Sequence, residues 1–157
     1  LVFSTLHTND APGAITRLVD MGVEPYLVAS SLEGVLAQRL VRLICTKCRE
    51  EHTLAAKDTI RLEPGREIPK KLWRGRGCKE CQGTGYHGRT CICELMQVTE
   101  DIRAAILERT SAGEIRKIAM KRNMRSLRTD GWRLVLAGRT TLEEVLRATK
   151  DEPLNGH

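Results

Sequence analysis

Aromatic residues and long apolar runs are both scarce in this sequence. Its 157 residues include two Trp, two Tyr and one Phe, so a core must be built mainly from Leu, Val, Ile and Ala. No apolar stretch approaches the roughly 20 residues that a helix needs to cross a bilayer, and we expect no transmembrane segment. The chain has 41% hydrophobic and 29% charged residues, a composition that excludes wholesale disorder.

A starting methionine and a signal peptide are also missing. The chain begins with the apolar run Leu1–Phe3 and shows neither the basic region nor the cleavage site of a secretory leader. We interpret the sequence as a piece of a longer protein, because a bare strand edge at position 1 would need upstream residues to pair with it. Since no export signal is present, the six cysteines favour a reducing, cytoplasmic compartment.

Residues 1–44 carry the pattern of the end of an α/β unit. A short strand is predicted over residues 1–4, followed by a polar turn and a helix that Asp10 caps and Gly22 ends. The segment 32–44 fits both the strand and the helical period, and we favour a strand.

The rest of the chain is predicted to divide into three parts. Residues 45–98, rich in Cys, Gly, Lys and Arg, are typical of a metal-stapled insertion, with a short helix near 54–62 and strands over 71–76 and 89–98. Residues 99–150 return to the helical period in four segments and predict a C-terminal helical bundle, in which Ser111 and Glu114 form a capping-box pattern. Residues 151–157 are expected to be a flexible tail.

Four cysteines have the spacing of a metal site. Two C-x2-C pairs are separated by 29 residues, and two such turns can direct four thiolates at one tetrahedral ion, for which zinc is the typical choice. The glycines that follow the second pair permit a tight backbone whose amides face the sulfurs. A closed four-sulfur shell leaves no position for substrate, so the predicted role is structural; buried apolar cysteines or disulfides are the alternative. The predicted ligands are Cys45, Cys48, Cys78 and Cys81.

The remaining cysteines and nearby histidines are left out of this site. Cys91 and Cys93 fall on the predicted strand 89–98, where we assign them to opposite faces as ordinary strand residues. His52 and His87 flank the cysteine pairs and could replace a ligand, but four cysteines already complete the shell.

His7 lies in the polar turn between the first predicted strand and the following helix. Ligand groups gather at such turns in α/β sheets, and an imidazole can donate or accept a proton near neutral pH. His7 could therefore contact a phosphate or orient water. The sequence alone favours the alternative that it only stabilises the turn.

Several runs together closely resemble the type II secretion and type IV pilus assembly ATPases, the GspE/PilB family. They cover nearly the whole chain and include the histidine turn, the strand before the first cysteine pair and the segment after the second. The matching runs are 1–14, Arg17-Leu18, 21–25, 35–42, the two C-x2-C pairs and Gly85-Tyr86-x-Gly88-Arg89.

The resemblance implies an α/β fold: the C-terminal part of a RecA-like ATPase core with an inserted zinc-binding subdomain and a C-terminal helical bundle. His7 matches the histidine that lies near the nucleotide γ-phosphate in this family, and Arg17 matches a basic position that contacts phosphate or holds the turn, although a solvated arginine fits the sequence equally well. The implied activity is ATP hydrolysis with Mg²⁺ in a cytoplasmic homo-hexamer, peripheral at the inner membrane, that acts with platform and adaptor proteins.

The chain has no P-loop. The pattern G-x-x-x-x-G-K-[ST] occurs nowhere in the sequence, and the acidic box and Walker B carboxylate of the family are expected upstream of His7. We therefore expect the isolated chain not to hydrolyse ATP.

A zinc-dependent nucleic-acid-binding module is a competing interpretation. The chain has a net charge of +6, and residues 60–91 hold eight Lys and Arg against three acids, a balance that suits phosphate contacts. Few aromatic residues accompany them, so we expect no nucleic-acid partner. The run Cys78–Gly85 also resembles one repeat of the chaperone DnaJ zinc region, which would instead indicate a module that binds unfolded clients.

Overall fold

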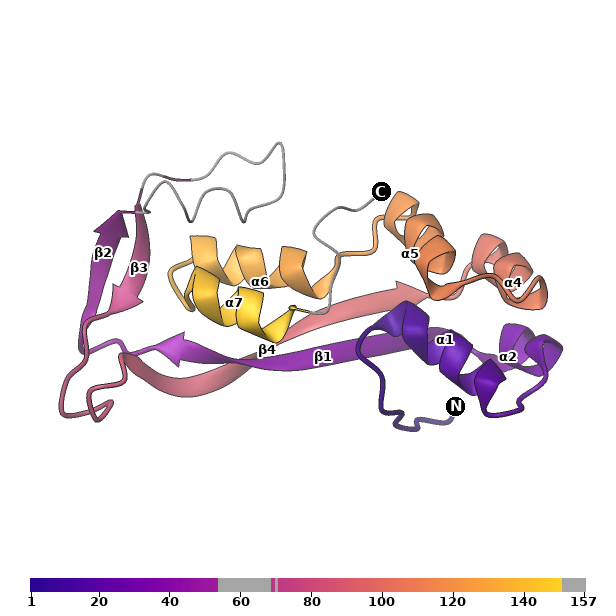
Figure 1. Cartoon of the computed structure of the whole chain (residues 1–157), viewed down its shortest axis with the longest axis horizontal. Coiled ribbons are helices and arrows are strands. Elements are labelled where there is room, and N and C mark those ends of the chain that lie inside the picture. Colours follow the sequence, from indigo (N-terminus) through magenta and orange to yellow (C-terminus); the bar gives the residue numbers. More distant parts are fainter. Residues whose placement is uncertain (54–68, 70, 151–157) are drawn as a thin grey trace. The chain divides into compact units, whose positions relative to one another are not determined.

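The computed structural model describes residues 1–53, 69 and 71–150. The chain forms two compact units, Leu1–Gln38 with Cys93–Leu127 and Arg39–Ile92 with Arg128–His157. Two long strands pair with each other, β1 (Gly34–Ile44) and β4 (Tyr86–Gln97), and each contributes residues to both units (Figure 1). None of the helices in the described ranges is long and apolar enough to span a membrane.

The first unit is built from four helices around one apolar core. They are α1 (Ala11–Asp20), α2 (Pro25–Ser31), α4 (Glu100–Leu107) and α5 (Ala112–Lys121). Helix α2 packs on α4, and α1 packs on α5. Their shared core is aliphatic, as the shortage of aromatic residues predicted, and includes Ile15, Val28, Met96, Ile102 and Ile115.

The predicted start and end of helix α1 are confirmed. Asp10 is the N-cap, and its Oδ1 accepts a hydrogen bond from the Gly13 amide at 2.7 Å. Pro12 occupies the first turn, where no amide hydrogen is required. Gly22 follows the helix with φ = 90°, a left-handed conformation that glycine adopts without a steric cost.

The strand predicted over residues 1–4 is wrong for this chain. Residues 1–8 have no regular secondary structure, and Leu1, Val2 and Phe3 are almost fully exposed. A strand needs a neighbouring strand to satisfy its backbone donors and acceptors, and no strand in the described ranges pairs with this segment. The strand favoured over 32–44 is confirmed as β1.

The second unit contains a short hairpin and two helices. β2 (Arg49–Thr53) pairs antiparallel with β3 (Lys71–Gly75), with Arg49 opposite Gly75. Helices α6 (Leu127–Leu136) and α7 (Leu142–Ala148) follow in sequence. A second apolar core joins the hairpin to both helices and contains Leu72, Trp132, Val135, Leu142 and Val145.

The four helices predicted after Thr99 are present, but they fall into both units. Helices α4 and α5 belong to the first unit. Helix α7 and all of α6 except Leu127 belong to the second unit. Ser111 caps α5 as expected, with the Glu114 amide donating to its Oγ at 3.4 Å, which is one half of the predicted capping box. The helix predicted near 54–62 lies outside the described residues.

Gly131 lies inside α6 at a point where a methyl group would collide with α7. An added Cβ would lie 2.6 Å from Cγ1 and 3.0 Å from Cγ2 of the buried Val145. Alanine is normally preferred to glycine in a helix by about 1 kcal/mol, but overpacking a filled core costs about 1–3 kcal/mol. We expect Gly131→Ala to lower the free energy of unfolding by about 1–2 kcal/mol, measured by denaturant unfolding with tryptophan fluorescence.

Gly113→Ala provides the matched control. Gly113 is exposed in α5, and its nearest neighbour would be Ser111 Oγ at 3.8 Å, so stability should stay equal or rise slightly. Equal stability of the two variants would contradict the close packing of α6 against α7.

Candidate metal centre and the polar networks

The four predicted ligands converge in the second unit. The sulfurs of Cys45, Cys48, Cys78 and Cys81 all lie within 4.8 Å of one another. Three of the residues are buried and Cys78 is partly buried, and none of the four is in a disulfide. The two C-x2-C turns, distant in sequence, therefore face one common point.

The spacing of the sulfurs fits a tetrahedral ion. The Sγ–Sγ distances are 3.8 Å for Cys45–Cys78, 3.8 Å for Cys48–Cys81 and 3.7 Å for Cys78–Cys81. A tetrahedral ion bound to thiolates at about 2.3 Å separates its sulfurs by about 3.8 Å, whereas a disulfide joins them at about 2.05 Å. The donor set and its geometry can thus hold one metal ion.

Backbone amides point at two of the sulfurs. The amides of Cys78 and Gly85 each donate to Cys81 Sγ at 3.2 Å, and the Gly77 amide donates to Cys48 Sγ at 3.3 Å. Such N–H donors stabilise the charge of a thiolate. The prediction that the glycines after the second pair would let amides face the sulfurs is confirmed at Gly85.

Close backbone approach requires glycine at two of these positions. A Cβ on Gly75 would lie 2.0 Å from the Gly85 carbonyl oxygen, and one on Gly85 would lie 2.4 Å from the Gly75 carbonyl oxygen. Gly85 also has φ = 77°, and its carbonyl accepts from the Cys45 amide at 2.9 Å. Gly85 therefore joins the two cysteine turns through its backbone.

The thiols of Cys48 and Cys81 differ in pKa. Burial raises the pKa of both, but at Cys81 the donors from Cys78 and Gly85 outweigh it and lower the pKa to about 6. At Cys48, with one amide donor from Gly77, burial dominates and raises the pKa to about 11. A bound cation would displace the remaining protons, because thiolates are the ligand form.

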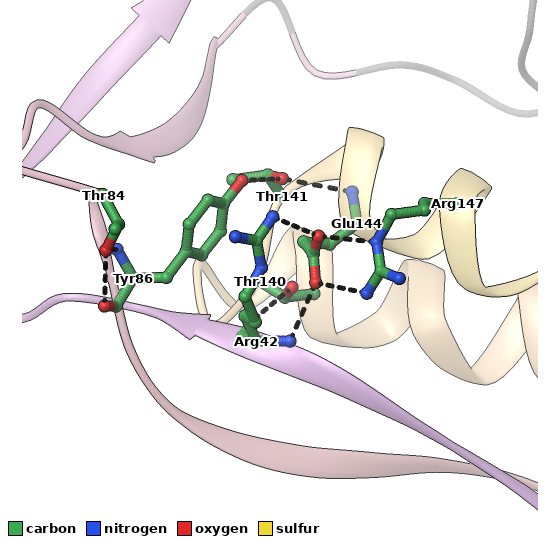
Figure 2. A network of polar contacts seen from close by, with 7 residues as sticks. All are labelled: Arg42, Thr84, Tyr86, Thr140, Thr141, Glu144 and Arg147. Carbon is green, nitrogen blue, oxygen red and sulfur yellow. Dashed lines mark hydrogen bonds and ion pairs between the residues drawn. The ribbon is translucent and has the colours of Figure 1, made fainter.

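A polar network next to the cysteines attaches α7 to β1 (Figure 2). Glu144, buried in the first turn of α7, accepts from the Arg42 guanidinium at 2.6 Å and from the Arg42 amide at 3.0 Å. Arg147 donates to both carboxylate oxygens, at 3.0 and 3.1 Å. The Arg42 guanidinium also lies over the Tyr86 ring, 4.1 Å from its centroid, a cation–π geometry.

Two threonines complete this network. The Tyr86 hydroxyl and Thr141 Oγ1 are hydrogen-bonded at 2.8 Å, and Thr141 caps α7 by accepting from the Glu144 amide at 3.3 Å. Thr140 Oγ1 donates to the Arg42 carbonyl at 2.7 Å. The turn before α7 is thus bonded to the strand that leads into Cys45.

The pKa of Glu144 reflects these contacts. Burial by itself would raise it, but hydrogen bonds from Arg42 and Arg147 outweigh burial and lower the pKa from 4.5 to about 2. Glu144 is therefore ionised throughout the neutral range.

Of the predicted site residues, His7 precedes α1 and Arg17 lies near its end. His7 is exposed in the turn that precedes the helix, and Arg17 is exposed in its last turn. The described part of the chain supplies neither side chain with a hydrogen bond or ion pair. Arg17 lies six residues after Ala11, the first residue of α1, and six residues of helix span about 9 Å. The structure therefore does not bring Arg17 next to the turn that holds His7, and the roles assigned to both residues stay predictions.

The assignment of Cys91 and Cys93 to opposite faces is wrong. Residues two apart in a strand share one face, and β4 shows this with Cys91 exposed, Ile92 buried and Cys93 half-buried. Neither belongs to the four-sulfur cluster. His52 and His87 are not among its ligands.

The sequence matches a known protein family over most of its length. The family model described as "Type II/IV secretion system protein" matches residues 1–147. The chain belongs to this type II/IV secretion system protein family. The resemblance found in the sequence is thereby confirmed.

Two relatives of this secretion family come from different machines. The type II secretion system protein HxcR of Pseudomonas aeruginosa is 50% identical over 151 residues, which cover 96% of this chain and 29% of HxcR. The type IV pilus assembly ATPase PilB of Thermus thermophilus is 49% identical over 152 residues, 95% of this chain and 17% of PilB. The chain thus spans less than a third of either relative.

A solved structure shows the same fold. The pilus retraction motor PilT with bound ADP matches with a TM-score of 0.59 and 22% identity, over 97% of this chain and 33% of PilT. Together with the four-cysteine cluster, this likeness confirms the predicted α/β fold class.

Sequence reasoning missed the buried charges of this secretion-family chain. It selected none of Arg42, Glu144 and Glu94 as site residues. A signal for Glu94 was available, because in β4 it follows the buried Ile92 by two residues and precedes the buried Met96 by two. A carboxylate on the inward face of a strand requires a partner.

Proposed function

We propose that the complete protein is a cytoplasmic ATPase that powers type II secretion or type IV pilus assembly, and that this chain is its C-terminal part. The observation that carries the proposal is the family match over residues 1–147. Relatives named for type II secretion and for pilus assembly are both close to 50% identical, so the two systems are equally supported. The P-loop and metal carboxylates would lie in the part of the protein outside this chain.

We propose that the ion of the cysteine cluster is zinc and that its role is structural. Zinc favours four thiolates in a tetrahedron, and the sulfur separations of 3.7–3.8 Å suit it. Four protein ligands leave no open position for substrate. Zinc would therefore hold the second unit together and take no part in ATP hydrolysis.

In this proposal His7 lies near the γ-phosphate of ATP, and Arg17 contacts phosphate. Two features of the chain support the role of His7: its side chain is exposed, and it precedes the N-terminus of α1 by four residues. Helix N-termini favour anions. ATP and Mg²⁺ would be held mainly by residues outside this chain.

The proposed assembly is a homo-hexameric ring, peripheral at the inner membrane. It would act on platform and adaptor proteins of the secretion or pilus machine, and the second unit would carry motion to a neighbour or to the platform. The family match and the secretion and pilus relatives support a role inside such a machine.

Replacing His7 in the full-length protein tests the function. We expect His7→Ala to lower kcat for ATP by on the order of 100-fold, the usual effect of removing a group that contacts a reacting phosphate or orients its water, while protein folding stays intact. ATP turnover under saturating Mg²⁺-ATP measures this. His87→Ala, an exposed histidine in the second unit, should leave kcat unchanged; equal turnover of both variants and the wild type would refute the role of His7.

A further inference from the structure

We propose that Glu94 is a positioning residue for the turn that carries His7. The inference rests on the proposed function of His7, because it concerns what places that histidine relative to the nucleotide. It is drawn from a buried network in the first unit that links β4, α5 and the first residues of α1.

Glu94 is fully buried, and one of its carboxylate oxygens accepts a hydrogen bond from the first residue of α1. Its Oε1 accepts from the Ala11 amide at 2.8 Å, a contact between residues 83 apart in sequence. Ala11 is the first residue of the helix and is also fully buried. Its amide is one of the N-terminal donors that a helix leaves without an internal partner, and Glu94 satisfies it from β4.

Arg116 binds Glu94 and Asp10 together. Its Nη1 donates to Glu94 Oε2 at 3.2 Å, and its Nη2 donates to Asp10 Oδ2 at 2.8 Å. The Arg116 side chain is 13% exposed, so the guanidinium is largely withdrawn from water. One arginine of α5 therefore bridges two carboxylates, and its planar guanidinium fixes how these carboxylates are oriented relative to each other.

Asp10 repeats the arrangement of Glu94. Its Oδ1 accepts from the Gly13 amide while its Oδ2 accepts from Arg116. Each carboxylate thus uses one oxygen for an amide in the first turn of α1 and the other for the same guanidinium. The position of the first turn of α1 is set by four bonds, of which two end on Arg116 and one on Glu94 Oε1.

The charges around Glu94 explain why a buried carboxylate can be kept here. Arg116 carries a positive charge between Glu94 and Asp10, and the N-terminus of α1 adds a partial positive charge that favours both carboxylates. An apolar residue at position 94 would fill the space without a charge to desolvate, but it could not accept from the Ala11 amide. Glu94 therefore fixes the position and orientation of the first turn of α1 through its bond to the Ala11 amide.

The side chain of His7 is exposed, so the position of His7 depends on how the first turn of α1 is held. Only Thr8 and Asn9 separate His7 from Asp10, and Thr8 Oγ1 donates to the Asp10 carbonyl at 3.2 Å. The end of the turn is therefore held by Asp10 and Ala11, and through them by Arg116 and Glu94. Glu94 would not touch ATP; it would act through the placement of the turn.

A double-mutant cycle in the full-length ATPase tests the proposal. Glu94→Gln keeps the shape of the side chain and removes its charge, and we expect kcat to fall about tenfold. The double variant Glu94→Gln with His7→Ala should have the same kcat as His7→Ala alone. Glu94→Gln acts only by misplacing the His7 imidazole, and that imidazole is already absent in His7→Ala.

Glu144→Gln is the matched control, since Glu144 is the other buried carboxylate bound to arginine, but in the second unit. Its effect on kcat, if any, should multiply with that of His7→Ala. An unchanged kcat in Glu94→Gln, where His7→Ala does lower kcat, overturns the proposal. An effect of Glu94→Gln that multiplies fully with His7→Ala also overturns it, because it indicates general destabilisation.

Hydrogen exchange separates this proposal from the proposed function. Amide exchange of residues 9–13, which include the bonded amides of Ala11 and Gly13, should rise at least tenfold in Glu94→Gln and stay unchanged in Glu144→Gln when followed by mass spectrometry. If exchange rises while His7→Ala leaves kcat unchanged, Glu94 positions the turn and the role of His7 in hydrolysis fails. Unchanged exchange in Glu94→Gln overturns the positioning role itself.

Discussion

Cys78→Ser is expected to abolish stoichiometric metal binding and to unfold the cysteine-containing part of the second unit. Serine is a poor ligand for the proposed zinc, and metal binding in such sites contributes on the order of 10 kcal/mol to folding. The other supports of the turns are hydrogen bonds, among them those from the Cys45 amide to Gly85, from the Arg76 amide to the Cys48 carbonyl and from the Gly83 amide to the Cys78 carbonyl. Elemental mass spectrometry of the purified protein would report the metal, and hydrogen exchange of residues 45–53 and 71–92 the unfolding.

Cys91→Ser is the matched control for the metal site. Cys91 is an exposed cysteine of β4 outside the four-sulfur cluster, so its loss should leave one metal ion per chain. Full metal content in Cys78→Ser would refute the four-thiolate site. Unchanged exchange in a metal-free Cys78→Ser protein would show that the ion does not stabilise the fold.

Glu144→Gln is expected to lower the free energy of unfolding by about 2–4 kcal/mol at pH 7. The substitution removes a buried charge, leaves Arg42 and Arg147 without their carboxylate, and weakens the contact between α7 and β1. Denaturant unfolding of the second unit, followed by tryptophan fluorescence because Trp132 is buried there, would measure the loss.

The difference in stability between the wild type and Glu144→Gln should depend on pH in one direction. Glu144 has a folded-state pKa of about 2 and an unfolded value near 4.5, so its ionised form contributes fully above about pH 5. The contribution should shrink as pH falls below 4.5 toward 2. Taking the difference between the two proteins at each pH removes the loss of metal in acid, which affects both.

Glu143→Gln is the control at the neighbouring position. Glu143 is exposed in the same first turn of α7, so the same charge change should alter stability by less than about 0.5 kcal/mol. Equal losses in the two variants, or a difference that does not shrink in acid, would contradict the role given to Glu144.

Local patterns predicted α1 and the convergence of the four cysteines because the physics involved is local. The Asp10 cap, Pro12 in the first turn and Gly22 at the end predicted α1 from a few consecutive residues. The two C-x2-C pairs predicted four ligands because each turn brings two sulfurs together by its own geometry.

Predictions failed where a residue depends on a distant partner. The strand over residues 1–4 failed because strand formation requires a neighbour, and the described ranges provide none. Glu94 and Glu144 were missed because their partners, Arg116 and Arg42, lie 22 and 102 residues away. Cys91 and Cys93 share the outward face of β4, which follows from strand geometry alone because residues two apart in a strand share one face.

The sequence by itself determined the family, helix α1, the four helices after Thr99, the two long strands and the four cysteines that converge, since these depend on short-range spacing, caps and turns. Only the tertiary structure decided which charges are buried, which amides face the sulfurs, and how the helices after Thr99 are shared between two cores. Those features depend on contacts between residues far apart in the chain. Hydrogen bonds and desolvation act over a few ångströms in space, so only the folded arrangement determines which groups they join.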